Sequence, residues 1–271
     1  MPDGGDWDDH LFKGAAPFYQ RGRLPYAAHL VGVLRDELDL DGRGTLVDFG
    51  SGPGTLAVLL AAEFQTVLAV EPDPEMAAHG RRNAADAGVT NLHWQVTPAE
   101  DVVLEPGTVD VAVFGQSYHW VNRPLMARRL RTALRPGGRF LLISDSKAPS
   151  PPSDVPATAV NRLIAEYLGD VRRAGRRVLP NGTPGNEEEI LDAAGYLDPR
   201  RLIVDDPGLL FRTVETLVAE VYSKSSSAQH LFGDRLDEFD SRLRDILRTG
   251  SVDGGYLVAK PSTEVRIWTN P

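Results

Sequence analysis

An acid and three glycines lie close together in the stretch Thr45-Leu-Val-Asp-Phe-Gly-Ser-Gly-Pro-Gly-Thr-Leu-Ala57. Asp48 precedes a turn that holds Gly50, Ser51, Gly52 and Gly54. Glycines lack the Cβ atoms that would keep a ligand away from the backbone. The helix expected after the turn directs its free N–H groups toward the adjacent crevice. This order of strand, glycine-rich turn and helix predicts a binding site for a nucleotide cofactor.

A second acid follows at the distance that ribose recognition requires. The apolar run 66–70 reads as a strand and ends at Glu71, 21 residues after Gly50. A carboxylate there can accept hydrogen bonds from both ribose hydroxyls. The dinucleotide fingerprint of dehydrogenases would place glycine or alanine at position 55, where this chain has Thr55, and it does not explain Asp48. A nicotinamide oxidoreductase is therefore disfavoured.

Polar and aromatic residues cluster where the fourth expected strand ends. Gln116, Tyr118, His119 and Trp120 follow one another there, at the edge where a substrate would meet the cofactor. Histidine titrates near neutral pH, so His119 is a candidate general base. The alternative is that it packs the turn and positions its neighbours. Gln116 is expected to hydrogen-bond substrate or cofactor. His230, in a polar loop, either reaches the substrate or is a solvent-exposed loop residue.

Short apolar runs alternate with helical patterns through the first half of the chain. The sequence predicts strands at 45–49, 66–70, 92–96, 109–114 and 139–143, and helices at 25–38, 54–63, 74–87 and 122–134. Residues 1–23 are expected to be irregular. Such alternation is typical of βαβ units and a parallel sheet.

The pattern changes at a proline-rich segment, 148–156. Helices are expected at 157–177 and 186–194, a strand at 200–205, two amphipathic helices after it, and a last strand at 263–269. The predicted fold class is α/β, a Rossmann-like sheet with helices on both faces and a helical cap inserted around the last strands. We expect three parts: an N-terminal segment and helix over the cofactor (1–40), the cofactor-binding core (41–147), and the cap with the last two strands (148–271).

Composition limits the classes of partner. The chain has 271 residues, of which 42% are hydrophobic and 25% charged, and its formal net charge is −9. An acidic protein is a poor nucleic-acid binder. No apolar run approaches the roughly 20 residues that span a bilayer. The acidic N-terminal region lacks the apolar core of a signal peptide, which favours a cytoplasmic location. Cysteine is absent and no metal-ligand spacing stands out, so no metal is predicted. A monomer and a homodimer both remain open.

Five segments, in order along the chain, resemble the motifs of class I S-adenosylmethionine-dependent methyltransferases. They are Asp48-Phe-Gly-Ser-Gly-Pro-Gly54, Val70-Glu-Pro-Asp-Pro-Glu-Met76, Thr97-Pro-Ala-Glu-Asp101, Asp110–Trp120 and Arg135–Leu142. The resemblance implies that the glycine loop cradles the methionine portion of the cofactor, while Glu71, in the motif with Pro72, binds the ribose. It also implies that Met76, Ala99 and Glu100 border the adenine.

The segment Phe18-Tyr-Gln-Arg-Gly-Arg-Leu-Pro-Tyr26 is similar to an N-terminal signature of methyltransferase-11-type enzymes, with Leu24 where that group often has proline. The resemblance implies that Tyr19 and Arg23 close over the cofactor, the arginine near its carboxylate.

The implied reaction is attack of a nucleophile on the activated methyl group of S-adenosylmethionine, which leaves S-adenosylhomocysteine. Alignment and exclusion of water can supply most of the catalysis. Aromatic side chains near the sulfonium, with Tyr19, Tyr118 and Trp120 as candidates, would add cation–π stabilisation. The sequence favours an oxygen or nitrogen acceptor on a small molecule of specialised metabolism. Carbon methylation, protein or peptide methylation, and a cofactor-binding regulatory or scaffold subunit are the alternatives.

Overall fold

The computed structural model describes residues 11–146, 153–174, 177–178 and 185–271. Its centre is a seven-stranded sheet in the order β3-β2-β1-β4-β5-β11-β8. These strands are β1 (Thr45–Phe49), β2 (Thr66–Val70), β3 (Leu92–Gln95), β4 (Val109–Gly115), β5 (Leu134–Asp145), β8 (Leu197–Val204) and β11 (Thr263–Thr269). Strands β1 to β5 run parallel, and β11 runs antiparallel to β5 and β8.

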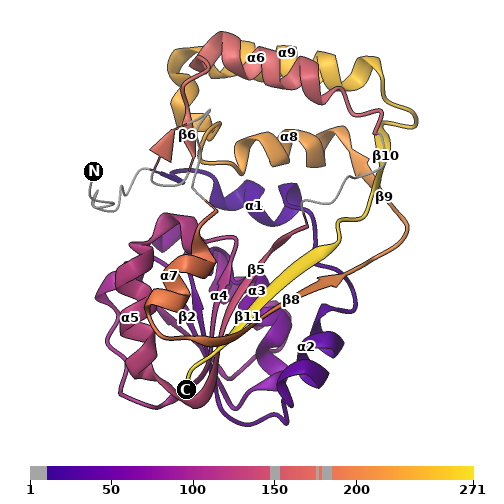
Figure 1. Ribbon diagram of the computed structural model, residues 1–271. Coiled ribbons are helices and arrows are strands. Elements are labelled where there is room, and N and C mark those ends of the chain that lie inside the picture. The colour runs from indigo at the N-terminus through magenta and orange to yellow at the C-terminus, as the bar shows by residue number, and fades with distance from the viewer. Residues whose placement is uncertain (1–10, 147–152, 175–176, 179–184) are drawn as a thin grey trace.

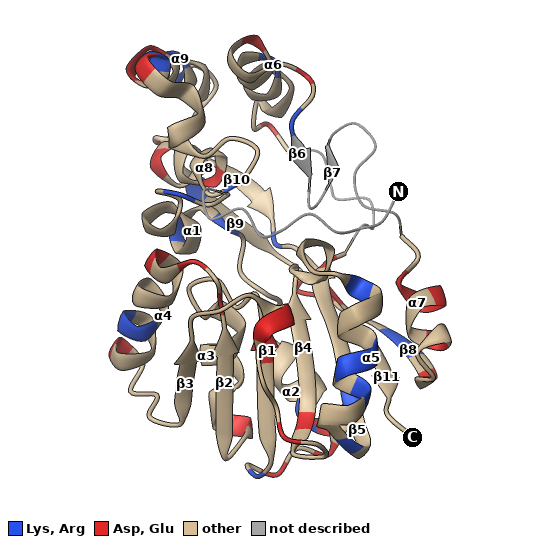
Figure 2. Ribbon diagram, turned by 90° about the vertical axis from the view of Figure 1, so that its left-hand side faces the viewer, with Lys and Arg blue, Asp and Glu red and all other residues tan. Residues whose placement is uncertain are grey.

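Helices cover both faces of this sheet (Figures 1 and 2). One face carries α5 (Arg123–Ala133) and α7 (Glu187–Ala193), and the other carries α2 (Leu30–Leu38), α3 (Thr55–Leu60) and α4 (Pro74–Asp86). Side-chain caps begin two of these helices: Asp73 accepts from the Glu75 and Met76 N–H groups, and Asn122 accepts from the Leu125 N–H. The predicted α/β class with helices on both faces is confirmed.

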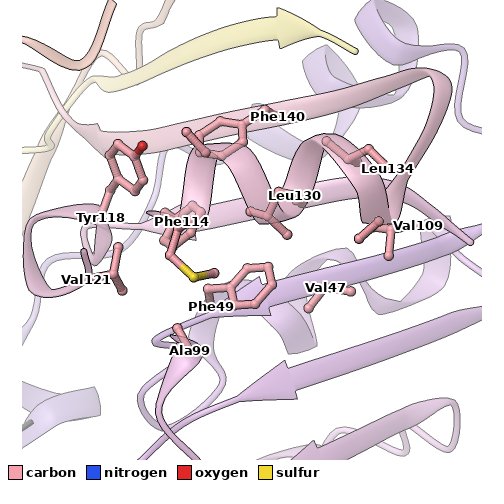
Figure 3. Packing of buried hydrophobic residues seen from close by; sticks show 14 of the residues in the cluster. Val47, Phe49, Ala99, Val109, Phe114, Tyr118, Val121, Leu130, Leu134 and Phe140 are labelled. Carbon is pink, nitrogen blue, oxygen red and sulfur yellow. The ribbon is translucent and has the colours of Figure 1, made fainter. Parts of the chain in front are cut away.

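The core beneath α5 is built from aromatic rings on neighbouring strands (Figure 3). Phe114 stacks on Phe49 with ring centroids 5.1 Å apart and on Phe140 at 5.4 Å. All three are at most 1% exposed. Offset aromatic pairs add about 0.5–1.5 kcal/mol each beyond the burial of their area. This rigid layer fixes the carboxyl ends of β1, β4 and β5, from which the loops of the site emerge.

A helical cap lies over the carboxyl ends of the parallel strands (Figure 1). It comprises α1 (Ala16–Gly22), α6 (Ala157–Leu168), α8 (Val214–Tyr222), α9 (Leu236–Thr249) and the antiparallel pair β9 (Leu209–Thr213) and β10 (Gly255–Ala259). Short 3₁₀ helices occupy Ala61–Glu63, Ala99–Asp101, Tyr118–Trp120 and Gln229–Arg235. The expected cap is present, and helix α1 belongs to it although it comes from the other end of the chain.

Several sequence expectations need correction. Residues 16–22 form α1 rather than irregular chain, and the pair β9–β10 has no counterpart in the expected elements. The helix expected at 157–177 ends at Leu168, because Gly169 follows with φ 76° and ends the helix. Two short strands, β6 (Arg173–Ala174) and β7 (Arg177–Val178), come after it. The helix expected at 25–38 begins only at Leu30.

Candidate cofactor and active site

A cavity of about 610 Å³, its open mouth included, lies at the carboxyl ends of β1, β2 and β4. Its size falls in the range of pockets that bind small molecules and cofactors. Ten of its lining residues are site candidates from the sequence: Tyr19, Gly50, Gly52, Glu71, Pro72, Met76, Ala99, Glu100, Gln116 and Trp120. The cavity lies where the strand order reverses between β1 and β4, the position at which open α/β sheets bind ligands.

Glu71 is held in place by backbone donors. The Gly52 N–H donates to its Oε2 at 2.8 Å and the Asp73 N–H donates to its Oε1 at 3.0 Å. The side chain is 5% exposed, and burial raises the pKa of Glu71 to about 7. Each carboxylate oxygen retains a second lone pair for a ligand. The carboxylate is therefore oriented before any ligand arrives.

Asp48 and Ser51 carry polar atoms that lack partners. Neither carboxylate oxygen of Asp48 nor the Ser51 hydroxyl makes a hydrogen bond within the described chain, and Asp48 is 1% exposed. Burial, with the Glu71 charge as the second cause, raises the pKa of Asp48 to about 7, although the nearby Ala57 N–H opposes this shift. Buried polar atoms without partners are rare and indicate that a ligand completes the site.

Tyr19 covers the glycine loop from α1. A Cβ added at Gly52 would meet the Tyr19 ring at 3.8 Å. The Arg23 guanidinium lies 4.7 Å from the centre of that ring and donates through Nη2 to the Ser223 carbonyl at 2.9 Å. Arg23 is not among the lining residues, and its Nε has no partner within the described chain. The cover over the cavity is thus linked to the end of α8.

The loop after β4 joins the cavity to a neighbouring carboxylate. Gln116 has φ 56°, a strained conformation for a residue other than glycine, and its Nε2 donates to Asp145 Oδ1 at 3.1 Å. Burial raises the pKa of Asp145, which Arg23 and the Gln116 hydrogen bond oppose and Glu220 reinforces. Asp145 was not a sequence candidate, because only the pairing of β4 with β5 brings it beside Gln116.

The three aromatic candidates after β4 lie in different surroundings, and only one of them lines the cavity. Trp120 lines the cavity beside Phe12, with ring centroids 5.6 Å apart. His119 lies against Trp120 at 4.9 Å and does not line the cavity. Burial, with Arg123 as the second cause, lowers the pKa of His119 to about 4. Tyr118 points into the core (Figure 3), where its hydroxyl donates to the Arg123 carbonyl at 3.0 Å.

Two further candidates lie away from the cavity lining. Gly54 is the left-handed N-cap residue immediately before α3, and it faces the Trp94 ring. His230 lies exposed in the 3₁₀ helix Gln229–Arg235 between α8 and α9, where its Nδ1 is 3.0 Å from the Lys13 carbonyl. Five lining residues were not sequence candidates: Phe12, Pro98, Gly115, Ser117 and Val121. Ser117 and Pro98 could have been predicted because they lie within or beside the sequence motifs. Phe12 could not, because only the folding of the N-terminal segment brings it to the cavity.

Residues 46–138 match the family model described as a methyltransferase domain. The chain is 27% identical over 204 residues to an uncharacterized methyltransferase of Mycobacterium tuberculosis, a match that covers 71% of this chain and 73% of that protein. The chain is a class I S-adenosylmethionine-dependent methyltransferase.

Solved structures share the fold of this methyltransferase. The structure of a putative type II methyltransferase from Anaeromyxobacter dehalogenans superposes with a TM-score of 0.58 at 21% identity, covering 92% of this chain and 98% of that one. A phosphoethanolamine N-methyltransferase of Haemonchus contortus, solved in complex with S-adenosyl-L-methionine, gives 0.53 at 16% identity, covering 99% and 59%. The cofactor of this methyltransferase is S-adenosylmethionine.

The residues present fit that cofactor. Asp48 and Ser51 lie next to the cavity without lining it, and their side-chain oxygens, which have no hydrogen-bond partner within the described chain, are acceptors for an ammonium group. The buried carboxylate of Glu71 lines the cavity itself. Among the described residues, no group of three or more His, Asp or Glu side chains is placed to hold a metal ion. No helix in the described part of the methyltransferase is long and apolar enough to cross a membrane.

Proposed function

We propose that this methyltransferase transfers the methyl group of S-adenosylmethionine to an oxygen or nitrogen of a small molecule in specialised metabolism. The observation that carries the proposal is the cover: α1 and α8 lie over the carboxyl edge of the sheet, and Tyr19 closes on the glycine loop. A covered cavity suits a small acceptor better than a protein or nucleic acid. It also excludes water from the reacting centre.

In this proposal each side of the cavity holds one part of the cofactor. Glu71 accepts from the ribose hydroxyls, while Met76, Ala99 and Glu100, with Pro72, border the adenine. The loop Gly50–Gly54 with Asp48 and Ser51 holds the methionine end, and Arg23 pairs with its carboxylate. Bound there, the cofactor supplies an electrophilic methyl group on a positive sulfur, and the acidic surroundings and aromatic rings favour that charge.

We place the acceptor where Gln116 meets Asp145. Gln116 belongs both to the cavity lining and to the hydrogen bond with Asp145, so it lies between cofactor and acceptor. Asp145 accepts the proton of an alcohol or ammonium acceptor, and its raised pKa suits that role better than a normal carboxylate would. His119 then positions Trp120 rather than taking a proton, since its pKa of about 4 makes it a weak base.

The experiment that tests the proposal follows labelled methyl from S-adenosylmethionine into size-fractionated lysate of the source cells. Label in the small-molecule fraction supports it, and fragmentation of the product shows whether oxygen, nitrogen or carbon was methylated. Label in protein or nucleic acid contradicts the substrate class. Binding of S-adenosylhomocysteine without any transfer would instead favour the regulatory or scaffold alternative.

Asp145→Asn tests the assignment of the proton acceptor in the same assay. Loss of a general base lowers kcat by about 10²–10⁴-fold, and S-adenosylhomocysteine affinity should stay unchanged. Asp154→Asn, at an exposed carboxylate before α6, is the matched control. A variant at position 145 that keeps wild-type kcat would remove Asp145 from the mechanism.

A further inference from the structure

A second cavity lies inside the cap, between α6 and α8 with α9 closing one side. Its volume is about 770 Å³, its open mouth included. Most of its wall is apolar and comes from three helices and the segment before α6: Val155, Val160, Ile164, Leu217, Val221 and Leu247. A cavity of this size and composition is typical of a site for the apolar body of a small molecule.

The cap cavity carries one positive charge, that of Arg172, which no acidic side chain of the described residues balances. Arg172 and Lys224 line it together with Glu220. Lys224 Nζ pairs with Glu220 Oε1 at 2.7 Å, and Arg212 Nη1 approaches Glu220 Oε2 at 3.5 Å, so the charge of the acid is already neutralised. No acidic side chain of the described chain pairs with Arg172, and its Nε is shielded from solvent without a hydrogen-bond partner. A guanidinium in such a place favours an anion.

Glu220 connects the cap cavity with the reacting centre. Glu220 lines the cap cavity, and its negative charge adds to the rise in the pKa of Asp145, which burial mainly causes. Asp145 accepts a hydrogen bond from Gln116, a residue of the cofactor cavity lining. The end of α8 also receives the Arg23 hydrogen bond at Ser223. The end of α8 therefore lines the cap cavity and also holds Arg23, which packs on the Tyr19 ring that covers the cofactor cavity.

We infer that the cap cavity binds the non-reacting part of the methyl acceptor, an apolar body that carries a carboxylate or phosphate-type anion paired with Arg172. The inference rests on the proposed transfer to a small molecule and narrows it to amphiphilic anions. The reacting atom lies at the Gln116–Asp145 end, and the anion lies at the opposite end of the acceptor. Because the anion does not react, the methylated product keeps its negative charge.

Calorimetric titration with dodecanoate, below its micelle concentration, tests the site without knowledge of the natural acceptor. We expect wild-type protein to bind dodecanoate at least tenfold more tightly than dodecan-1-ol. Arg172→Gln should remove this preference, and Arg172→Glu should reverse it in favour of dodecylammonium. Arg162→Gln, at an exposed arginine on α6, is the matched control and should bind as wild type does. Absence of dodecanoate binding, or equal binding by wild type and Arg172→Gln, overturns the inference.

A second measurement separates an acceptor site from a site for some other ligand. Labelled small-molecule product from lysate should be retained on an anion exchanger, and Arg172→Gln should raise the KM for its formation at least tenfold with little change in kcat. A product that is not retained, or an unchanged KM, contradicts the inference even if dodecanoate binds. S-adenosylhomocysteine affinity, measured on every variant, should not change. If wild-type protein did not bind S-adenosylhomocysteine, the proposed function would be refuted. The dodecanoate titrations would still test whether the cap cavity binds an apolar anion.

Discussion

The two cavities of this methyltransferase differ in charge and in the way the chain builds them. The cofactor cavity is acidic: Glu71 lines it and Asp48 lies buried beside it at the end of β1. Backbone N–H groups of Gly52 and Asp73, in the turns that follow β1 and β2, hold the Glu71 carboxylate. The cap cavity is mostly apolar, and side chains of helices distant in sequence form its wall together with Arg172, whose Nε has no hydrogen-bond partner within the described chain. The charge of each cavity would therefore attract a different ligand, the cationic cofactor to the acidic cavity and an anionic acceptor to the cap cavity, before any specific contact forms.

The difference also shows where specificity can change. Strand ends and a glycine turn tolerate few replacements, since each backbone position supports a hydrogen bond. A helical cap that packs through apolar side chains tolerates exchanges of similar volume more readily. We therefore expect the elements of the sheet to determine the methyl donor and the side chains of the cap to determine the methyl acceptor.

Removing Glu71 is the strongest test of the cofactor half of this comparison. Glu71→Ala deletes a preoriented acceptor and should weaken S-adenosylhomocysteine binding by about 1–3 kcal/mol, or roughly fivefold to over a hundredfold. Calorimetry measures the affinity. Glu75→Ala, at an exposed carboxylate in the first turn of α4, should bind normally. If both variants bind equally well, the second strand does not contribute the ribose acceptor.

Gly22 tests whether the cap and the cofactor cavity depend on each other. A Cβ at Gly22 would come within 2.4 Å of the Ala219 backbone in α8, so Gly22→Ala must push α1 away. Such overpacking costs about 1–3 kcal/mol of folding free energy. Thermal unfolding should show the loss, and S-adenosylhomocysteine affinity should fall as Tyr19 moves off the glycine loop.

The control for this variant is Gly32→Ala in α2, where no atom lies within 4 Å of the added Cβ. It should raise stability by about 0.5–1 kcal/mol because alanine is the better helix former. An unfolding temperature of Gly22→Ala equal to that of wild type would mean that the contact between α1 and α8 is loose.

We expect Asp48 to strengthen cofactor binding and, at the same time, to lower the folding stability of the protein without cofactor. Its pKa is raised to about 7, so the native state holds the proton more tightly than the unfolded chain and loses stability as pH rises from about 4 to about 7. Asp48→Asn should raise the unfolding free energy at pH 8 by about 1–3 kcal/mol. The same change should weaken cofactor binding by about 1–2 kcal/mol.

The pH dependence of binding separates the two effects. Wild-type affinity should fall as pH drops below about 7, where Asp48 and Glu71 gain protons. In Asp48→Asn one of these titrations is gone, so the slope should be shallower. Equal slopes in the two proteins would show that Asp48 is not charged in the complex.

The sequence predicted the cofactor cavity far better than the cap, for a physical reason. Strands β1, β2 and β11 have the predicted bounds, because short apolar runs between turns determine them locally. Ten candidate residues line the cavity, since motifs at strand ends meet wherever strands run parallel. The position of α1, the pair β9–β10 and the neighbours of Arg172 depend on tertiary packing, for which a single sequence carries no periodic signal.

The sequence pattern makes His119 a candidate general base, whereas its buried surroundings in the structure argue against that role. Its replacement should therefore have the smallest effect on the rate among these predictions. With a pKa of about 4 the imidazole stays neutral from pH 6 to 9, so it cannot produce a titration in that range. His119→Gln keeps a polar side chain beside Trp120, and we expect the pH profile of kcat to keep its shape, with less than about a fivefold fall in rate (~1 kcal/mol). Steady-state rates across pH check this expectation. If the variant lost the change of kcat with pH that wild type shows near pH 6–7, His119 would be the base. The methyl acceptor would then lie near Trp120 rather than near Asp145.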